Sequence, residues 1–127
     1  MKKKMSMLIV SLMLTHVMLA TVHIHYLQKS VYEAGRQQWG DWQNEANAFC
    51  IDSTTLSIVN LSTKSETVYV RQGEAIGGYN ERGNYYRLFE AQNEKGQKCL
   101  FFLYSDRNVG LLFKCEEAGV IIQYAGY

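Results

Sequence analysis

A single apolar run dominates the N-terminal part of the hydropathy pattern. Residues 5–27, "MSMLIVSLMLTHVMLATVHIHYL", contain no acidic or basic side chain other than three histidines, and three lysines precede them at positions 2–4. A membrane-spanning helix needs about 20 mostly apolar residues, and flanking lysines stay on the cytoplasmic side. The pattern therefore predicts a basic cytoplasmic start over residues 1–4 and a transmembrane signal-anchor helix over residues 5–27.

The same run permits a second interpretation. A cleavable signal peptide also begins with basic residues, but it prefers a shorter apolar segment and a small-x-small cleavage site. The best candidate site follows Ala20, where Met18 occupies a position that favours a small residue. We therefore expect an uncleaved, single-pass protein of a bacterial cell membrane with its C-terminal domain outside the cytoplasm, and a cleaved, exported protein is the alternative.

The spacing of apolar residues continues at three and four positions after the predicted membrane segment. Trp39, Trp42, Ala46 and Phe49 recur at helical intervals, with polar side chains between them. Such a stripe is typical of one face of an amphipathic helix. The sequence thus predicts an amphipathic helix over residues 28–50 that packs on the remaining domain through Trp39, Trp42 and Phe49.

From residue 51 the pattern changes to short β-rich segments separated by polar turns. Strands rich in β-branched and aromatic residues with turn residues between them favour an antiparallel meander or a small sandwich. The segments are 54–60, 66–72, 84–91, 98–104, 110–116 and 119–125. The predicted fold class is α+β, in which a long N-terminal helix covers an antiparallel β-sheet formed by residues 51–127.

Charge and composition narrow the range of functions. The chain carries 13 basic and 12 acidic residues, so removing the three N-terminal lysines leaves 10 against 12, a net charge of −2. A nucleic-acid-binding protein usually carries a clustered basic face. We therefore expect no direct nucleic-acid partner, and instead other membrane or envelope proteins and membrane lipid; the oligomeric state is open.

The three cysteines lie in the part of the chain that we expect outside the cytoplasm, where disulfides form. If the segment around residues 105–110 closes a hairpin, Cys99 and Cys115 fall nearly opposite each other and Cys50 is left over. Pairing of Cys50 with either of the others remains open, because the sequence does not fix the connectivity, and three buried free thiols in a reducing compartment are the alternative to any disulfide.

No reaction chemistry emerges from the remaining residues. The three histidines all belong to the apolar run, so the predicted domain has no histidine for a Ser-His or Cys-His pair. The sequence contains no CxxC spacing of a zinc site. We therefore expect no enzyme activity, no metal and no cofactor.

The segment "GGYNERGNYYRLF" is the candidate contact surface. Tyrosine and arginine are favoured at the energetic centres of protein interfaces. The candidate residues are Tyr79, Arg82, Tyr85, Tyr86 and Arg87.

The order of these features resembles that of the minor pilins and pseudopilins of bacterial competence and type II secretion machines. The resemblance rests on the short basic start, the helix "MLIVSLMLTHVMLATVHIHYL", its continuation "WGDWQNEANAF" and the following antiparallel sheet. It implies a helix packed in a filament core and a sheet domain that faces outward, and it assigns no functional residue.

Three hypotheses follow for the function. The first is a membrane-anchored, extracytoplasmic interaction protein, an accessory component of a DNA-uptake, pilus or secretion apparatus. The second is a secreted or periplasmic inhibitor or immunity protein, released by cleavage of a signal peptide. The third is an exclusion protein encoded by a phage or plasmid.

Overall fold

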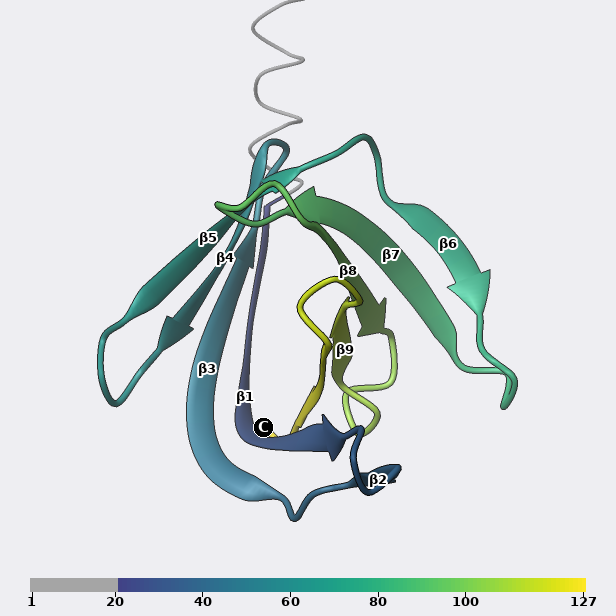
Figure 1. Ribbon diagram of the computed structural model, residues 1–127. Helices are drawn as coiled ribbons and strands as arrows, with labels where there is room; N and C mark the ends of the chain where they lie inside the picture. Colours follow the sequence, from purple (N-terminus) through teal and green to yellow (C-terminus); the bar gives the residue numbers. More distant parts are fainter. Residues whose placement is uncertain (1–20) are drawn as a thin grey trace, which may run out of the picture.

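The computed structural model describes residues 21–127, and this part of the chain forms ten β-strands and no helix (Figure 1). The strands are β1 (Val22–Glu33), β2 (Gln38–Trp39), β3 (Gln43–Ile51), β4 (Thr55–Asn60), β5 (Glu66–Arg71), β6 (Ile76–Tyr79), β7 (Tyr85–Gln92), β8 (Lys98–Tyr104), β9 (Leu111–Cys115) and β10 (Val120–Ala125).

Eight of these strands close into an antiparallel barrel. Their order is β1-β3-β4-β5-β7-β8-β9-β10, and β10 returns to pair with β1 in a register that places Gln28 opposite Ala125 and Val31 opposite Ile122. Two short strands lie outside this ring: β2 pairs with the end of β1, and β6 pairs with β7. Successive strands of the ring are neighbours, so the connections within the described part are mostly hairpins.

The predicted α+β fold and its amphipathic helix over residues 28–50 are wrong. The segment forms most of β1, the short β2 and nearly all of β3. In β3 the buried positions alternate, with Asn47, Phe49 and Ile51 facing the interior, as expected for a strand with one face in the core. The helical stripe arose because Trp39 and Trp42 belong to β2 and its following loop rather than to the same element as Phe49.

The predicted single-pass anchor over residues 5–27 is also corrected. Its last residues belong to β1, in which Val22, Ile24 and Tyr26 alternate with the exposed His23 and His25. Within residues 21–127 no helix has the length and apolar character to cross a membrane. The predicted single-pass membrane localisation and the pilin-like architecture both depended on a long N-terminal helix, and β1 and β3 occupy its place within the described part. Residues 5–20 of the prediction lie outside the described part.

The strand predictions for the C-terminal part are confirmed. The six predicted segments correspond to β4, β5, β7, β8, β9 and β10, and each pairs antiparallel with its neighbour in the ring. The prediction missed β6, which has two glycines in four residues and therefore a weak strand signal.

Aromatic side chains fill the interior of the barrel. Phe49 packs edge-on against both Tyr26 and Tyr124, with ring centroids 5.8 and 4.9 Å apart. Phe101 packs edge-on against Tyr69 at 5.1 Å and in a tilted arrangement against Phe113 at 4.9 Å. An eight-stranded barrel has an interior just wide enough for its own side chains. The interior therefore serves as the hydrophobic core.

Candidate functional site

The hairpin of β6 and β7 presents most of the predicted contact residues. Its turn is fixed by Asn80, whose side-chain Oδ1 accepts hydrogen bonds from the backbone N–H groups of Arg82 and Asn84 at 3.0 and 2.9 Å. Gly83 adopts a positive φ of 82° in this turn, a conformation that glycine reaches without steric cost. The turn therefore positions the exposed side chains around it by local hydrogen bonding.

Two glycines in β6 allow two tyrosines of β7 to lie flat on the hairpin. A Cβ atom added at Gly77 would lie 2.5 Å from the hydroxyl of Tyr85, and one added at Gly78 would lie 2.8 Å from that of Tyr86. Adjacent residues of a strand point to opposite faces, so Tyr85 covers one face of the hairpin and Tyr86 the other. Aromatic cover of this kind protects strand glycines that have no side chain of their own.

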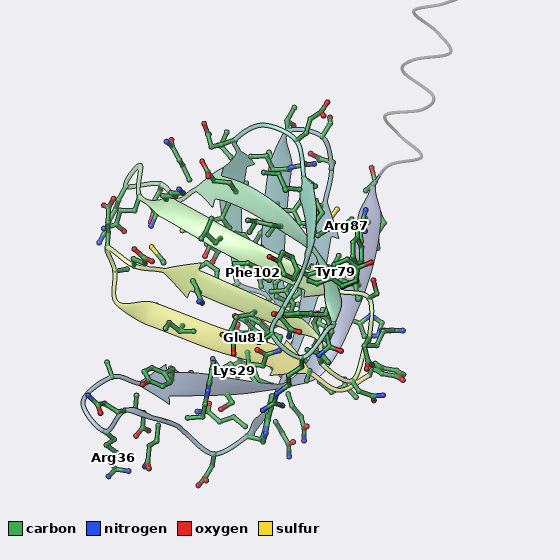
Figure 2. The ribbon with its side chains drawn as sticks, turned by 90° about the vertical axis from the view of Figure 1, so that its right-hand side faces the viewer. Lys29, Arg36, Tyr79, Glu81, Arg87 and Phe102 are labelled. Carbon is green, nitrogen blue, oxygen red and sulfur yellow. The ribbon has the colours of Figure 1, made fainter. Side chains whose placement is uncertain are left out.

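The outer face of the hairpin borders an open groove of about 400 Å³. The ring of Tyr86 stands edge-on against Phe102 and Tyr104, with centroids 5.1 and 5.7 Å away. Leu112 from the next strand lines the same groove. Phe102 of β8 lines the groove, and Tyr79 of β6 borders it at the hairpin; both residues are labelled in Figure 2. The groove thus has an aromatic floor built by three neighbouring strands, β7, β8 and β9.

Charged side chains form the rim of the groove. Glu81 and Arg82 come from the turn of the hairpin, and Lys114 comes from β9. The Lys114 ammonium lies 5.7 Å from the centre of the Phe102 ring, within cation–π range. None of these three groups takes part in the ion pairs that we find within residues 21–127. The rim therefore offers two cations and one anion to a partner beside an apolar floor.

The predicted contact residues lie together but not on one face. Tyr79 and Tyr85 are directly opposite each other across the hairpin, with ring centroids 5.3 Å apart, and Arg87 shares their face. The Arg87 guanidinium lies 5.6 Å from the centre of the Phe89 ring. Tyr86 points to the opposite face, toward the groove floor. The surface consequently has two sides, and the side of Tyr86 carries the groove.

The residues predicted to join a helix to the sheet have different environments. Phe49 is 1% exposed and belongs to the core. Trp39 is 45% exposed in β2, where its ring lies edge-on to Tyr32 at 5.5 Å, and Trp42 is 51% exposed. The two tryptophans border a second cavity of about 370 Å³ with Ser30, whose hydroxyl donates to the Gly40 carbonyl.

The cysteines are free thiols, and two of them are buried within the barrel. Burial and the adjoining Cys115 thiol raise the pKa of Cys99 to about 12. Such a thiol has little nucleophilic character at neutral pH. In the part of the chain that the structure describes, no group of three or more histidine, cysteine or acidic side chains is arranged to hold a metal ion.

Sequence reasoning missed the groove floor. Phe102, Tyr104, Leu112 and Lys114 were assigned to strands, but their faces were not. In β8 the odd-numbered residues Cys99, Phe101 and Leu103 are buried, so the even-numbered residues point outward. The register of neighbouring strands would have placed these outward residues beside Tyr86, and a sequence pattern alone does not supply that register.

No known protein family matches this chain, and neither a curated protein nor a solved structure matches it.

Proposed function

We propose that this protein is a non-catalytic binding module that holds a segment of another protein in the aromatic groove beside the β6–β7 hairpin. The observation that supports the proposal is the combination, on one outer face, of the Tyr86–Phe102–Tyr104 cluster with the cations Arg82 and Lys114. Neither cation joins an ion pair with another residue of the described part, 21–127. Aromatic and arginine side chains dominate the energetics of protein interfaces.

The chemistry of the groove specifies the partner segment. An aromatic or large aliphatic side chain would bury apolar area on Phe102 and Leu112, at roughly 25 cal/mol for each Å² removed from water. An acidic residue beside it would approach Lys114 and Arg82 at the rim. The expected partner segment is therefore apolar and acidic, and the acidic residue contributes orientation and association rate more than affinity.

The hypothesis of an inhibitor or immunity protein uses the same surface, since both functions consist of binding a protein. The barrel supplies a rigid support for the groove, because each groove strand is paired on both edges in the closed ring. Membership of an uptake, pilus or secretion apparatus stays a prediction from the sequence, as do the exclusion protein and the absence of enzyme activity.

A peptide selection tests the proposal directly. The full-length protein, immobilised, is used to select binders from a library of random peptides displayed on phage. We expect the selected peptides to share an aromatic or large aliphatic residue with an aspartate or glutamate nearby. The Lys114→Glu variant should select peptides in which a basic residue replaces the acidic one, because the charge of the rim is reversed beside an unchanged floor.

Matched variants separate the groove from the rest of the surface. Lys95→Glu, at the exposed β7–β8 turn, makes the same change of charge away from the groove and should leave the selected motif unaltered. Tyr86→Ala should reduce binding of the selected peptides at least about fivefold, since loss of a central aromatic contact costs more than about 1 kcal/mol. Selection of no common motif, or of one that ignores both changes at the groove, would refute the proposal.

A further inference from the structure

Strand β6 has a free edge. It pairs with β7 along one side, and within residues 21–127 no strand pairs with its other side. Figure 1 shows β6 at the outer margin of the molecule. Ile76 and Tyr79, at its two ends, are 65% and 71% exposed, more than the other large apolar side chains that we find exposed in this part of the chain. An exposed edge with apolar side chains is a template for pairing with another strand.

The hydrogen-bonding groups at this edge can be assigned from the pairing with β7. The Asn80 N–H donates to the Asn84 carbonyl at 3.0 Å, which makes these two residues a hydrogen-bonded pair. Hydrogen-bonded and non-hydrogen-bonded pairs alternate along an antiparallel ladder. The pair Gly78–Tyr86 is then hydrogen-bonded, whereas the pairs formed by Gly77 and by Tyr79 are not.

It follows that Gly77 and Tyr79 direct their backbone N–H and C=O groups away from β7, toward the free edge. The neighbouring strand is consistent with this assignment: the Tyr85 carbonyl, opposite Tyr79, accepts from the Ser105 N–H on the far side of β7. The free edge of β6 therefore presents two residues with outward donors and acceptors, separated by Gly78.

We propose that β6 pairs antiparallel with β6 of a second copy of this chain, about a two-fold axis at Gly78. In this register Gly77 faces Tyr79 of the second copy and Tyr79 faces its Gly77. Each pair exchanges two hydrogen bonds, so the groups at the free edge satisfy one another. The contact is isologous, because the same residues contribute from both copies.

The charges beside β6 favour this register. A two-fold axis at Gly78 brings Glu74, four residues before it, toward Arg82 of the second copy, four residues after it. Both side chains are exposed, and neither is part of the ion pairs found in residues 21–127. The segment 74–82 thus carries one acidic group before β6 and one basic group in the turn after it, four residues to either side of Gly78, which makes it complementary to itself in the antiparallel direction.

Side-chain packing favours a second copy as well. Tyr79 would lie opposite Gly77 of the second copy, beside the ring of Tyr85 that already covers that glycine in its own chain. Two copies would thereby bring Tyr79 and Tyr85 of each chain into one aromatic cluster on a single face. A closed two-fold pair also consumes the free edge and ends further addition of strands.

Sedimentation equilibrium of the full-length chain tests the proposal. A reversible species of twice the chain mass of 14.6 kDa is expected. Arg82→Glu and Glu74→Arg should each weaken the dimer, by about tenfold in Kd or less as for an exposed ion pair. The double variant should restore it, since the pair is then exchanged rather than lost. Lys95→Glu, at the β7–β8 turn, is the control for charge and should leave the Kd unchanged.

A second variant tests the backbone contact. Tyr79→Pro removes an N–H that makes no bond to β7, and proline is tolerated at strand edges, so the far-ultraviolet circular dichroism of the barrel should persist while the dimer is lost. A monomer at all concentrations would overturn the proposal. So would open-ended oligomers, a dimer insensitive to the β6 variants, or a double charge reversal that fails to restore association.

Discussion

Cys99 and Cys115 face each other across β8 and β9 inside the barrel. The register of these strands pairs Leu100 with Lys114, and the next pair along the ladder is Cys99 with Cys115. Both cysteines are buried, at 0% and 2% exposure. Cys50 lies between the buried Phe49 and Ile51 of β3, so its side chain points to the outer face of the barrel. The register therefore favours a Cys99–Cys115 pairing over either pairing with Cys50, although both are free thiols in the structure.

Refolding in a glutathione redox buffer is expected to link Cys99 to Cys115 and to leave Cys50 free. The two thiols would lose two protons and two electrons to oxidised glutathione, which is released as two reduced molecules. The bond should raise the free energy of unfolding by about 3 kcal/mol, because it closes a loop of moderate length in the unfolded chain. Peptide mapping after alkylation checks the pairing, and Cys50→Ser is the matched control. A linked peptide that contains Cys50 would contradict the prediction.

The buried hydroxyl of Tyr26 predicts a stabilising substitution. Tyr26 is 0% exposed, and its hydroxyl has no hydrogen-bond partner within residues 21–127. An unsatisfied buried polar group costs about 1–3 kcal/mol, so Tyr26→Phe should raise the free energy of unfolding by about 1 kcal/mol at neutral pH. Urea denaturation measures the change. Tyr127→Phe, at a position that is 61% exposed, should have no effect.

The same substitution should also alter the response to alkaline pH. Burial, partly opposed by the Arg107 charge, raises the pKa of Tyr26 from 10.0 to about 12. A raised pKa means that the unfolded chain loses the phenolic proton first, so the stability due to neutral Tyr26 is lost as the pH rises from 10 through 12. The advantage of Tyr26→Phe should therefore increase across this range. An advantage that stays constant from pH 9 to 12 would contradict the assignment.

A polar cluster at the inner face of β1 and β3 predicts the response to acid. The Glu45 carboxylate accepts from the Asn47 amide at 2.9 Å and pairs with the Lys29 ammonium at 3.0 Å. These two contacts, the Asn47 hydrogen bond first, hold the pKa of Glu45 below its ordinary value of 4.5 against the opposing effect of burial. The stability they contribute is present above the ordinary pKa and is lost as the pH falls below it.

Glu45→Gln should consequently lower the free energy of unfolding by about 1 kcal/mol at pH 7, a value for a partly exposed charged pair. The difference from the unsubstituted protein should be smaller at pH 3 than at pH 7, because Glu45 is increasingly protonated as the pH falls below 4.5. Urea denaturation at both pH values measures it. Glu94→Gln, at an exposed turn, serves as the control and should change neither value. A deficit that persists unchanged at pH 3 would show that the loss arises from packing.

The sequence predicted the second half of the fold better than the first because its strands are separated by strong turn signals. Asn60, Asn93 and Asp106 each accept backbone hydrogen bonds in the turns that the sequence indicated. In the first half, Trp39 and Trp42 are spaced like residues on one face of a helix, although Trp39 belongs to β2 and Trp42 to the loop that follows it. The alternation of Val22, Ile24 and Tyr26 in β1 was hidden by the apolar residues that precede it. Closure of the ring by β1 and β10 depends on pairing between the ends of the chain, which a local pattern does not contain.

Only part of the candidate site could be predicted from the sequence, because some of its residues come from strands outside the β6–β7 hairpin. Tyr79, Arg82, Tyr85, Tyr86 and Arg87 lie close in the sequence, and a single hairpin brings them together. The groove floor comes from β8 and β9, whose outward residues join Tyr86 only through the register of three strands. Local segments of a site can thus be recognised from composition, whereas the residues that other strands contribute require the fold.

Two glycines with similar backbone conformations should differ sharply in their tolerance of alanine. Gly110 and Gly96 both adopt a positive φ, 86° and 76° respectively, a region that costs any other residue about 1 kcal/mol or more. At Gly96 an added Cβ atom would have nothing within 4 Å. At Gly110 it would lie only 1.9 Å from the Tyr124 carbonyl oxygen, a backbone atom held in the β9–β10 pairing.

Gly96→Ala should therefore lower the free energy of unfolding by about 1 kcal/mol, the conformational cost alone. Gly110→Ala must in addition displace backbone next to the buried Tyr124, whose ring packs on Phe49, so its loss should exceed that of Gly96→Ala by at least about 2 kcal/mol. Thermal or urea unfolding of the two variants, followed by circular dichroism, measures the difference. Equal losses would mean that the Tyr124 backbone lies farther from Gly110 than in this structure. Because β10 closes the ring by pairing with β1, such a result would also contradict the closure of the barrel.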